Sequence, residues 1–140
     1  MEFVRALVAF LSKNGVLPPE VTSSDVAEKE REKTYLQALP DAPAKAYCVR
    51  WYDTSVSTLV NKQVGVYRIQ VLMRNPKQGE LLTEIEALWR FLLNRPEPVE
   101  DISDKYWVIF DVQSGPVPLG KDDKGNYLYS LNFPVKTKLF

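Results

Sequence analysis

The chain has 140 residues, of which 45% are hydrophobic and 26% are charged, and we expect it to form one globular domain over residues 1–140. Lysine and arginine together number 18, as do aspartate and glutamate, so no overall positive charge draws the protein to nucleic acid or to an anionic membrane. Histidine is absent and Cys48 is the only cysteine, which excludes histidine-based catalytic triads, internal disulfides and multi-thiolate zinc clusters.

The first predicted element is an amphipathic helix over residues 2–14. Gly15 would cap it in a left-handed conformation, and Pro18 and Pro19 would keep the helix from resuming. Charged residues interrupt its apolar run, so we interpret it as part of the fold and not as a secretion signal. No stretch approaches the roughly 20 apolar residues that cross a bilayer, and we expect no membrane partner.

The next region is predicted to contain two short strands between two polar segments. Residues 22–33 are highly charged and offer almost no apolar face, which indicates a solvated short helix or loop. Strands are predicted over residues 34–39 and 46–53, which are rich in residues that favour β-structure. Residues 54–63 are polar, and we interpret them as a long connection or hairpin tip that is a candidate contact arm.

The most regular pattern is a long strand over residues 64–74 followed by an amphipathic helix over residues 80–94. In the strand, apolar side chains alternate with a polar set formed by Arg68, Gln70 and Arg74, as expected when a sheet buries one face. In the helix, leucines recur at helical spacing and acidic residues occupy the first half, where the helix dipole favours them. The polar set is a candidate subunit or partner contact, with ordinary solvent exposure as the alternative.

The last part of the chain is predicted to be mostly strand. An acidic loop over residues 95–104 precedes a strand over 105–113, a turn-rich loop over 114–126 and a final strand over 127–138. Strands that arrive in runs, without alternating with helices, predict an α+β fold. We expect a single antiparallel or mixed β-sheet with the two α-helices packed on one face.

Residues with catalytic or metal-binding potential are few. Cys48 lies in a predicted strand with no histidine to activate it, which favours a buried structural thiol over a nucleophile. Glu97, Glu100, Asp101 and Asp104 are candidate ligands for a divalent cation or paired carboxylates, but their irregular spacing favours a solvated loop. No cofactor, metal site or catalytic residue is therefore predicted.

Two tryptophans are candidates for an interface. Trp51 and Trp107 each lie on the face of a predicted strand that alternates with a more apolar set. Tryptophan is enriched both in protein cores and at the centres of protein interfaces. Both readings of Trp51 and Trp107 stay open at this point.

Taken together, the elements resemble one known family, the tail terminator (minor capsid or head–tail joining) proteins of long-tailed bacteriophages. The resemblance covers nearly the whole chain and rests on the order of elements and on loose motifs. These are the N-terminal helix, the segment Tyr35-Leu36-Gln37-Ala38-Leu39-Pro40-Asp41-Ala42-Pro43, the strand end Arg50-Trp51-Tyr52-Asp53-Thr54, the strand Val66–Arg74 with its helix, and the close Asp123-Lys124-Gly125-Asn126-Tyr127 through Phe133.

This resemblance implies a structural protein of the virion with no enzymatic activity, assembled in the host cytoplasm. Such proteins form a homo-oligomeric ring, typically a hexamer, that docks on the head-proximal end of the tail tube, stops tube polymerisation and offers a surface to the head connector. The implied partners are copies of itself, the tail tube protein and the head connector protein, with DNA in the lumen as a passive contact. Two alternatives remain: another head–tail connector completion protein, and a small carboxylate-dependent enzyme that uses the acidic loop.

Overall fold

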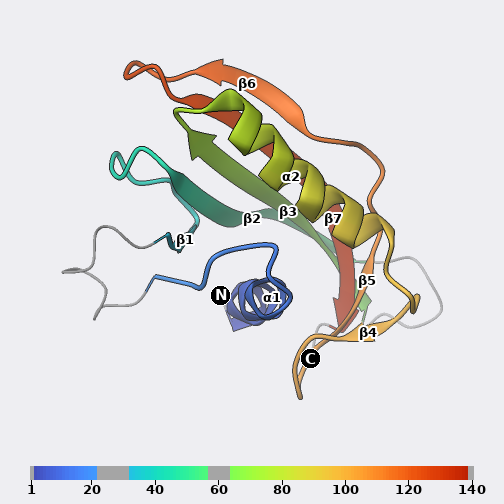
Figure 1. The fold of residues 1–140 in the computed structure, drawn as a ribbon. Helices are drawn as coiled ribbons and strands as arrows, with labels where there is room; N and C mark the ends of the chain where they lie inside the picture. The colour runs from blue at the N-terminus through green and yellow to red at the C-terminus, as the bar shows by residue number, and fades with distance from the viewer. Residues whose placement is uncertain (1, 22–31, 57–63, 139–140) are drawn as a thin grey trace.

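A computed structural model describes residues 2–21, 32–56 and 64–138 (Figure 1). Most of the charged segment 22–33 and of the predicted contact arm 54–63 therefore lies outside the described residues. The described part contains two helices and seven strands. They are α1 (Glu2–Lys13), β1 (Thr34–Leu36), β2 (Ala46–Val56), β3 (Val64–Asn75), α2 (Gln78–Leu93), β4 (Glu100–Asp101), β5 (Trp107–Phe110), β6 (Val117–Lys121) and β7 (Tyr127–Lys138).

The strands form one mixed sheet in the order β1-β2-β3-β7-β5-β4, with β6 beside the first part of β7. Only the β1–β2 pair is parallel among the named strands; the other pairs are antiparallel. β3 is central, because β2 and β7 pair with it along almost its whole length. The predicted α+β class and mixed sheet are confirmed.

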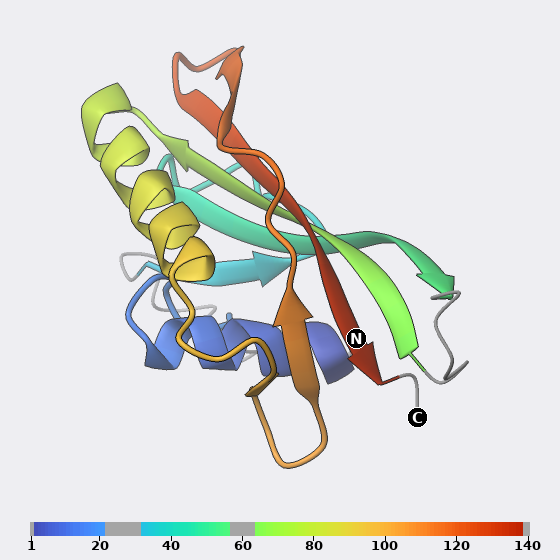
Figure 2. The ribbon, with the colours of Figure 1, turned by 90° about the vertical axis from the view of Figure 1, so that its right-hand side faces the viewer.

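The expected packing of both helices on one face of a single sheet is corrected by the structure. The sheet is curled and makes up most of the fold, and the helices lie against different parts of it (Figures 1 and 2). Figure 1 shows α1 end-on and α2 along its length, so the two helices cross steeply. The periodicity of the helices predicts an apolar face for each, but it does not predict how far the strands twist between them.

The hydrophobic core is formed by side chains of the curled sheet and of both helices. Alternate side chains of β3 and β7 are buried there, and so are those of α2 that recur at helical spacing. The innermost members are Leu7 and Leu11 of α1, Ile69, Val71 and Met73 of β3, Ile85 and Leu88 of α2, and Leu131, Phe133 and Val135 of β7. The predicted apolar faces of the central strand and its helix are thus confirmed.

The end of α1 follows the sequence-based prediction. Gly15 has a φ of 76°, a conformation that is strained for residues with a side chain. The amides of Gly15 and Val16 donate hydrogen bonds back to the carbonyl oxygens of Ser12 and Leu11, at 3.0 and 3.1 Å. The helix therefore ends with its last carbonyls satisfied, and the chain turns away towards Pro18.

The short strands differ from the predicted ranges. β1 ends at Leu36, because Gln37 takes a positive φ of 72° and leaves the strand. β2 continues to Val56, past a bulge between Trp51 and Asp53, whereas a connection was expected from residue 54. β5 covers only 107–110 of the predicted 105–113.

Two strands were not predicted at all. β4 has two residues and lies in the expected acidic loop, and β6 lies in the expected turn-rich loop. All five residues of β6 are exposed and include Pro118 and Gly120, so they carry neither the alternation nor the composition of a typical strand. The predicted reversal at 123–126 is confirmed, since it joins β6 to β7 with Gly125 at a φ of 81°.

Candidate functional site

The side of β2, β3 and β7 opposite their buried core residues is called the outer face. It carries Arg50 of β2, Arg68 and Gln70 of β3, and Asn132 and Lys136 of β7. The strand register places Arg50, Gln70 and Asn132 in one row across these three strands. Of these side chains Arg68 is exposed, and the other four are half-buried.

Arg68 and Gln70 lie where the sequence predicts them. The Arg68 side chain is 45% exposed, and its Nε lies 3.3 Å from Oδ2 of Asp53 on the neighbouring strand. An ion pair this exposed adds little stability, so Arg68 keeps most of its capacity for a partner. Gln70 is half-buried among its strand neighbours. Both remain candidate contact residues.

Arg74 lies on the same side of β3 but is buried, with 6% of its surface exposed. Its guanidinium donates hydrogen bonds to the carbonyl oxygens of Ala44, at 3.1 Å, and Pro43, at 2.6 Å. Asp122 of the β6–β7 turn lies 4.0 Å away. Arg74 thus holds the loop before β2 against the sheet, and it offers no surface to a partner in this structure.

The two tryptophans are placed differently. Trp51 is half-buried against the core, its ring centroid 5.6 Å from that of Tyr67, and its indole N–H donates to the carbonyl oxygen of Asp53 at 3.0 Å. These contacts give Trp51 a structural role. Trp107 is also half-buried, but it precedes the core residue Val108 in β5 and lies opposite Asp101 of β4. It remains a candidate contact residue beside the outer face.

The acidic group does not converge on a common point. Glu100 is paired with Arg95, whose Nε lies 2.7 Å from a carboxylate oxygen. The guanidinium carbon of Arg95 also lies 4.1 Å from the centre of the Phe91 ring. Glu97, Asp101 and Asp104 are exposed and have no ion pair within the described part of the chain. In the same part, no acidic or cysteine side chains gather in a group of three or more that could hold a metal ion. We call residues 97–104 the acidic tip.

Cys48 is fully buried in β2. Burial raises the pKa of its thiol to about 11, although the nearby Arg50 acts in the opposite direction. The thiol is therefore protonated and shielded at neutral pH, which supports the structural role inferred from the sequence.

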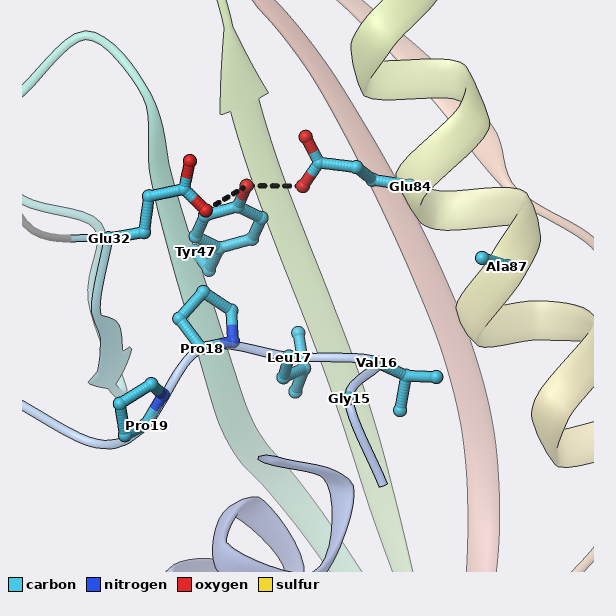
Figure 3. A pocket seen from close by; sticks show the side chains of 9 residues that line it. All are labelled: Gly15, Val16, Leu17, Pro18, Pro19, Glu32, Tyr47, Glu84 and Ala87. Atoms are coloured by element: carbon cyan, nitrogen blue, oxygen red, sulfur yellow. Dashed lines mark hydrogen bonds between the residues drawn. The ribbon is translucent and has the colours of Figure 1, made fainter. Parts of the chain in front are cut away.

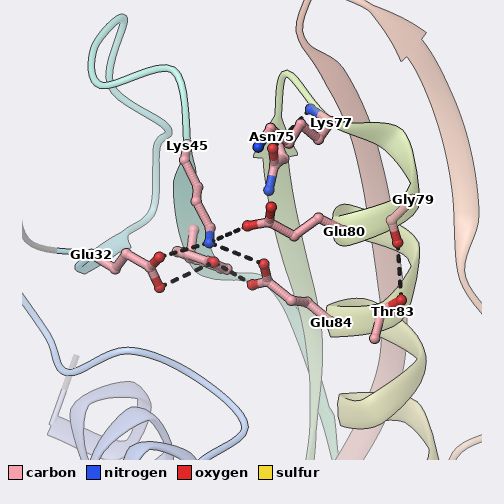
Figure 4. A network of polar contacts seen from close by, with 9 residues as sticks. Glu32, Lys45, Asn75, Lys77, Gly79, Glu80, Thr83 and Glu84 are labelled. Atoms are coloured by element: carbon pink, nitrogen blue, oxygen red, sulfur yellow. Dashed lines mark hydrogen bonds and ion pairs between the residues drawn. The ribbon is translucent and has the colours of Figure 1, made fainter.

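A polar network that the sequence did not reveal centres on Lys45 (Figure 4). Its ammonium lies 2.6 Å from a carboxylate oxygen of Glu32, 2.5 Å from one of Glu80 and 3.3 Å from one of Glu84. Burial alone would lower the pKa of Lys45, but the hydrogen bonds to Glu32 and Glu80 outweigh it and raise the pKa. The spacing of Glu80 and Glu84 on one helix face was visible in the sequence, but the lysine that joins them was not.

Tyr47 extends this network into a hollow of about 350 Å³ between α2 and residues 15–19 (Figure 3). Its hydroxyl donates a hydrogen bond to Glu84 and lies 3.5 Å from Glu32. Burial, followed by the bond to Glu84, raises the pKa of Tyr47 above its ordinary value. The carboxylates at this hollow are already engaged by Lys45 and Tyr47, so they tie α2 to β2 and form no acid–base pair for catalysis.

Comparison with known proteins separates the two classes of function considered so far, a structural protein of the virion and a carboxylate-dependent enzyme. The sequence pattern of one family, described as bacteriophage tail terminator protein, matches residues 10–139, nearly the whole chain. The chain belongs to the bacteriophage tail terminator family. A search of curated proteins gave no match.

Membership of the tail terminator family confirms the resemblance seen in the order of elements. It makes the protein a structural component of a phage virion, with a role in the tail or in head–tail joining, and it points away from enzymatic activity. No helix in the described ranges is long and apolar enough to span a membrane. The outer face and the acidic tip are therefore the candidate contact surfaces of this tail terminator.

Proposed function

We propose that this tail terminator forms a ring of identical copies, a hexamer by analogy with its family, on the head-proximal end of the tail tube. The ring stops polymerisation of the tube and presents a docking surface to the head connector protein. The observation that carries this proposal is the family match over residues 10–139. The virion is the place of action, and assembly takes place in the host cytoplasm.

The exposed surface of the fold supports a role in assembly. A closed ring needs two different surfaces on each copy that fit one another. The chain has a polar sheet face and, at the β4 edge of the sheet, an exposed acidic tip. The 18 basic and 18 acidic residues balance, which fits a lumen that DNA passes through without tight binding.

The test is an assembly assay with purified tail tube protein. Tubes grown with the tail terminator present should stop at defined lengths and carry a ring at one end in negative-stain images. Tubes grown with an equal amount of an unrelated globular protein should continue to elongate. The proposal fails if the protein stays monomeric at high concentration and neither binds nor caps the tubes.

The same material separates tail termination from a connector completion role. Immobilised tail terminator should retain tube protein from solution, and after capping it should also retain connector protein. Retention of the connector protein alone, with no binding to the tube, would assign the chain to connector completion.

A further inference from the structure

We propose that the acidic tip of one copy docks on the outer face of the next copy, around Arg50 and Arg68, and that this contact closes the ring. The inference rests on the proposed ring and adds to it which two surfaces meet. The partner that binds the outer face is a second copy of this chain. Charge complementarity between its acidic tip and the outer face is the argument for this partner.

The outer face is positively charged where β2 and β3 meet. Arg50, Arg68 and Lys136 lie on this side of three adjacent strands. Asp53 pairs with Arg68, and the amide of Asp111 donates to the carbonyl oxygen of Pro134, which lies opposite Arg68. Arg50 and Lys136 form no ion pair within residues 32–56 and 64–138. The half-buried Val66, between Ser55 and Lys136, gives the same region an apolar contact. Arginine beside apolar area is a common composition at the centre of interfaces.

The acidic tip has the complementary composition. Glu97, Asp101 and Asp104 are exposed without an ion pair in the described part, and Val99 between them is 50% exposed. Lys13 lines a hollow together with Asp101 and Asp104, but no ion pair joins it to either residue within the described part. The tip therefore offers an exposed apolar residue near exposed acidic residues, which matches the apolar and positive composition of the outer face.

The topology makes this contact intermolecular. β4 lies at one edge of the sheet, whereas β2 and β3 lie towards the opposite edge, with β7 and β5 between them. The tip of one copy is thus separated from its own Arg50 and Arg68 by the width of several strands, about 4.8 Å each. Two different surfaces on separate parts of one chain can produce a head-to-tail contact, which closes into a ring when the rotation per copy allows it.

The experiment reverses the charges of each surface separately and then together. Arg50→Glu with Arg68→Glu, and Asp101→Lys with Asp104→Lys, should each raise the dissociation constant between copies about a hundredfold, because like charges then face each other. Mixing the two variants should restore association beyond a dimer, because the intact tip of one fits the intact face of the other and the two reversed surfaces also fit each other. A chain with all four substitutions should associate again, with the dependence on salt that the original chain shows.

A matched control carries the same change of charge elsewhere. Arg90→Glu with Lys124→Glu alters two exposed residues of α2 and the β6–β7 turn, and it should leave association unchanged. Circular dichroism and thermal unfolding verify that each variant is folded. If a reversed variant does not fold, the milder Arg68→Gln and Asp104→Asn serve in a double-mutant cycle, whose coupling should be about tenfold.

Association is measured by sedimentation velocity in free solution and by imaging of rings on tail tubes. The inference is overturned, and the proposed function survives, if the original chain caps tubes and the reversed variants cap them equally well, or if the fourfold variant does not regain association. Both proposals fall if the original chain neither associates nor caps tubes.

Discussion

Arg68 and Arg74 both lie on the polar side of the alternating pattern of β3, but they have different structural roles. Both belong to the polar side of β3, but the loop before β2 covers only the end that carries Arg74. Arg74 consequently satisfies two backbone carbonyl oxygens from a buried position, while Arg68 pairs with Asp53 in contact with water. The first residue is a structural anchor, and the second is available for assembly.

Replacing Arg74 by methionine should therefore lower the free energy of unfolding by about 2–3 kcal/mol, because the carbonyl groups of Pro43 and Ala44 lose a charged donor. Arg68→Met is the matched control and should change it by less than about 1 kcal/mol, since an exposed ion pair contributes little. Urea unfolding followed by circular dichroism measures both. Equal effects from the two substitutions would contradict the structural role given to Arg74.

At the scale of elements, the network around Lys45 connects three segments that are distant in sequence. Lys45 directly precedes β2 and Tyr47 lies near its start. Glu80 and Glu84 belong to the first half of α2, and Glu32 to the segment before β1. The apolar faces of β2 and α2 are buried in the core as well, so the network adds a polar tie to a contact that hydrophobic burial already provides.

This tie should give stability a defined dependence on pH. The hydrogen bond and charge of Lys45 hold the pKa of Glu80 below 4.5, so the folded state binds fewer protons than the unfolded state just below that pH, and stability falls as pH decreases through this range. The pKa values of Lys45 and Tyr47 lie above their ordinary 10.5 and 10.0, so the folded state keeps protons that the unfolded state loses, and stability falls again above pH 10.

Lys45→Met should reduce the pH dependence of stability at both the acidic and the alkaline end, because it removes the lysine that lowers the pKa of Glu80 and one of the groups whose own pKa is raised. The measurement is the urea midpoint at a series of pH values. Lys124→Met, at an exposed lysine with no carboxylate partner in the described part, should leave the profile unchanged. An unaltered profile in Lys45→Met would show that the network does not contribute to stability.

Replacement of two glycines by alanine should change the free energy of unfolding in opposite directions. Gly125 has a φ of 81° in the β6–β7 turn, so Gly125→Ala should cost about 1 kcal/mol of stability. Gly79 lies in the first turn of α2, and an added Cβ would meet no atom within 4 Å, so Gly79→Ala should stabilise the protein by about 0.5–1 kcal/mol. Chemical denaturation of both variants checks the signs; two changes in the same direction would contradict these backbone assignments.

At the scale of the whole molecule, the sequence was most informative where a pattern was long. The central strand, its helix and the last strand span 11 residues or more, and their ranges agree with the structure within a few residues. Over that length the periods of 2 and 3.6 differ clearly, and burial of one face is enough to fix the element.

The short strands and the burial of individual side chains could not be predicted from the sequence, for physical reasons. β4 and β6 are too short to show a period, and they form because β5 and β7 offer free edges to pair with. The alternation of β3 gives the side on which Arg74 lies, but the loop that buries it comes from a distant segment. Of the candidate contact residues, Arg68, Gln70 and Trp107 stay open to a partner, whereas Arg74 and Trp51 are held by intramolecular contacts.

The central position of β3 also predicts which part of the fold is most resistant to local unfolding. β3 has partners on both sides along almost its whole length, whereas β6 pairs on one side only and all of its residues are exposed. Amides of β3 should therefore exchange with deuterium last, at the rate set by global unfolding, and those of β6 early. Mass spectrometry of exchanged peptides tests this order, and early exchange throughout β3 would contradict it.

The burial of the only thiol of the chain has a practical consequence. Because Cys48 is inaccessible and its pKa is raised to about 11, it should not react with maleimides while the sheet is closed. The rate of its alkylation therefore reports how often the sheet opens. A second cysteine introduced on the outer face or at the acidic tip would be the only reactive one, so fluorophores can be attached there and the distance between copies followed during assembly.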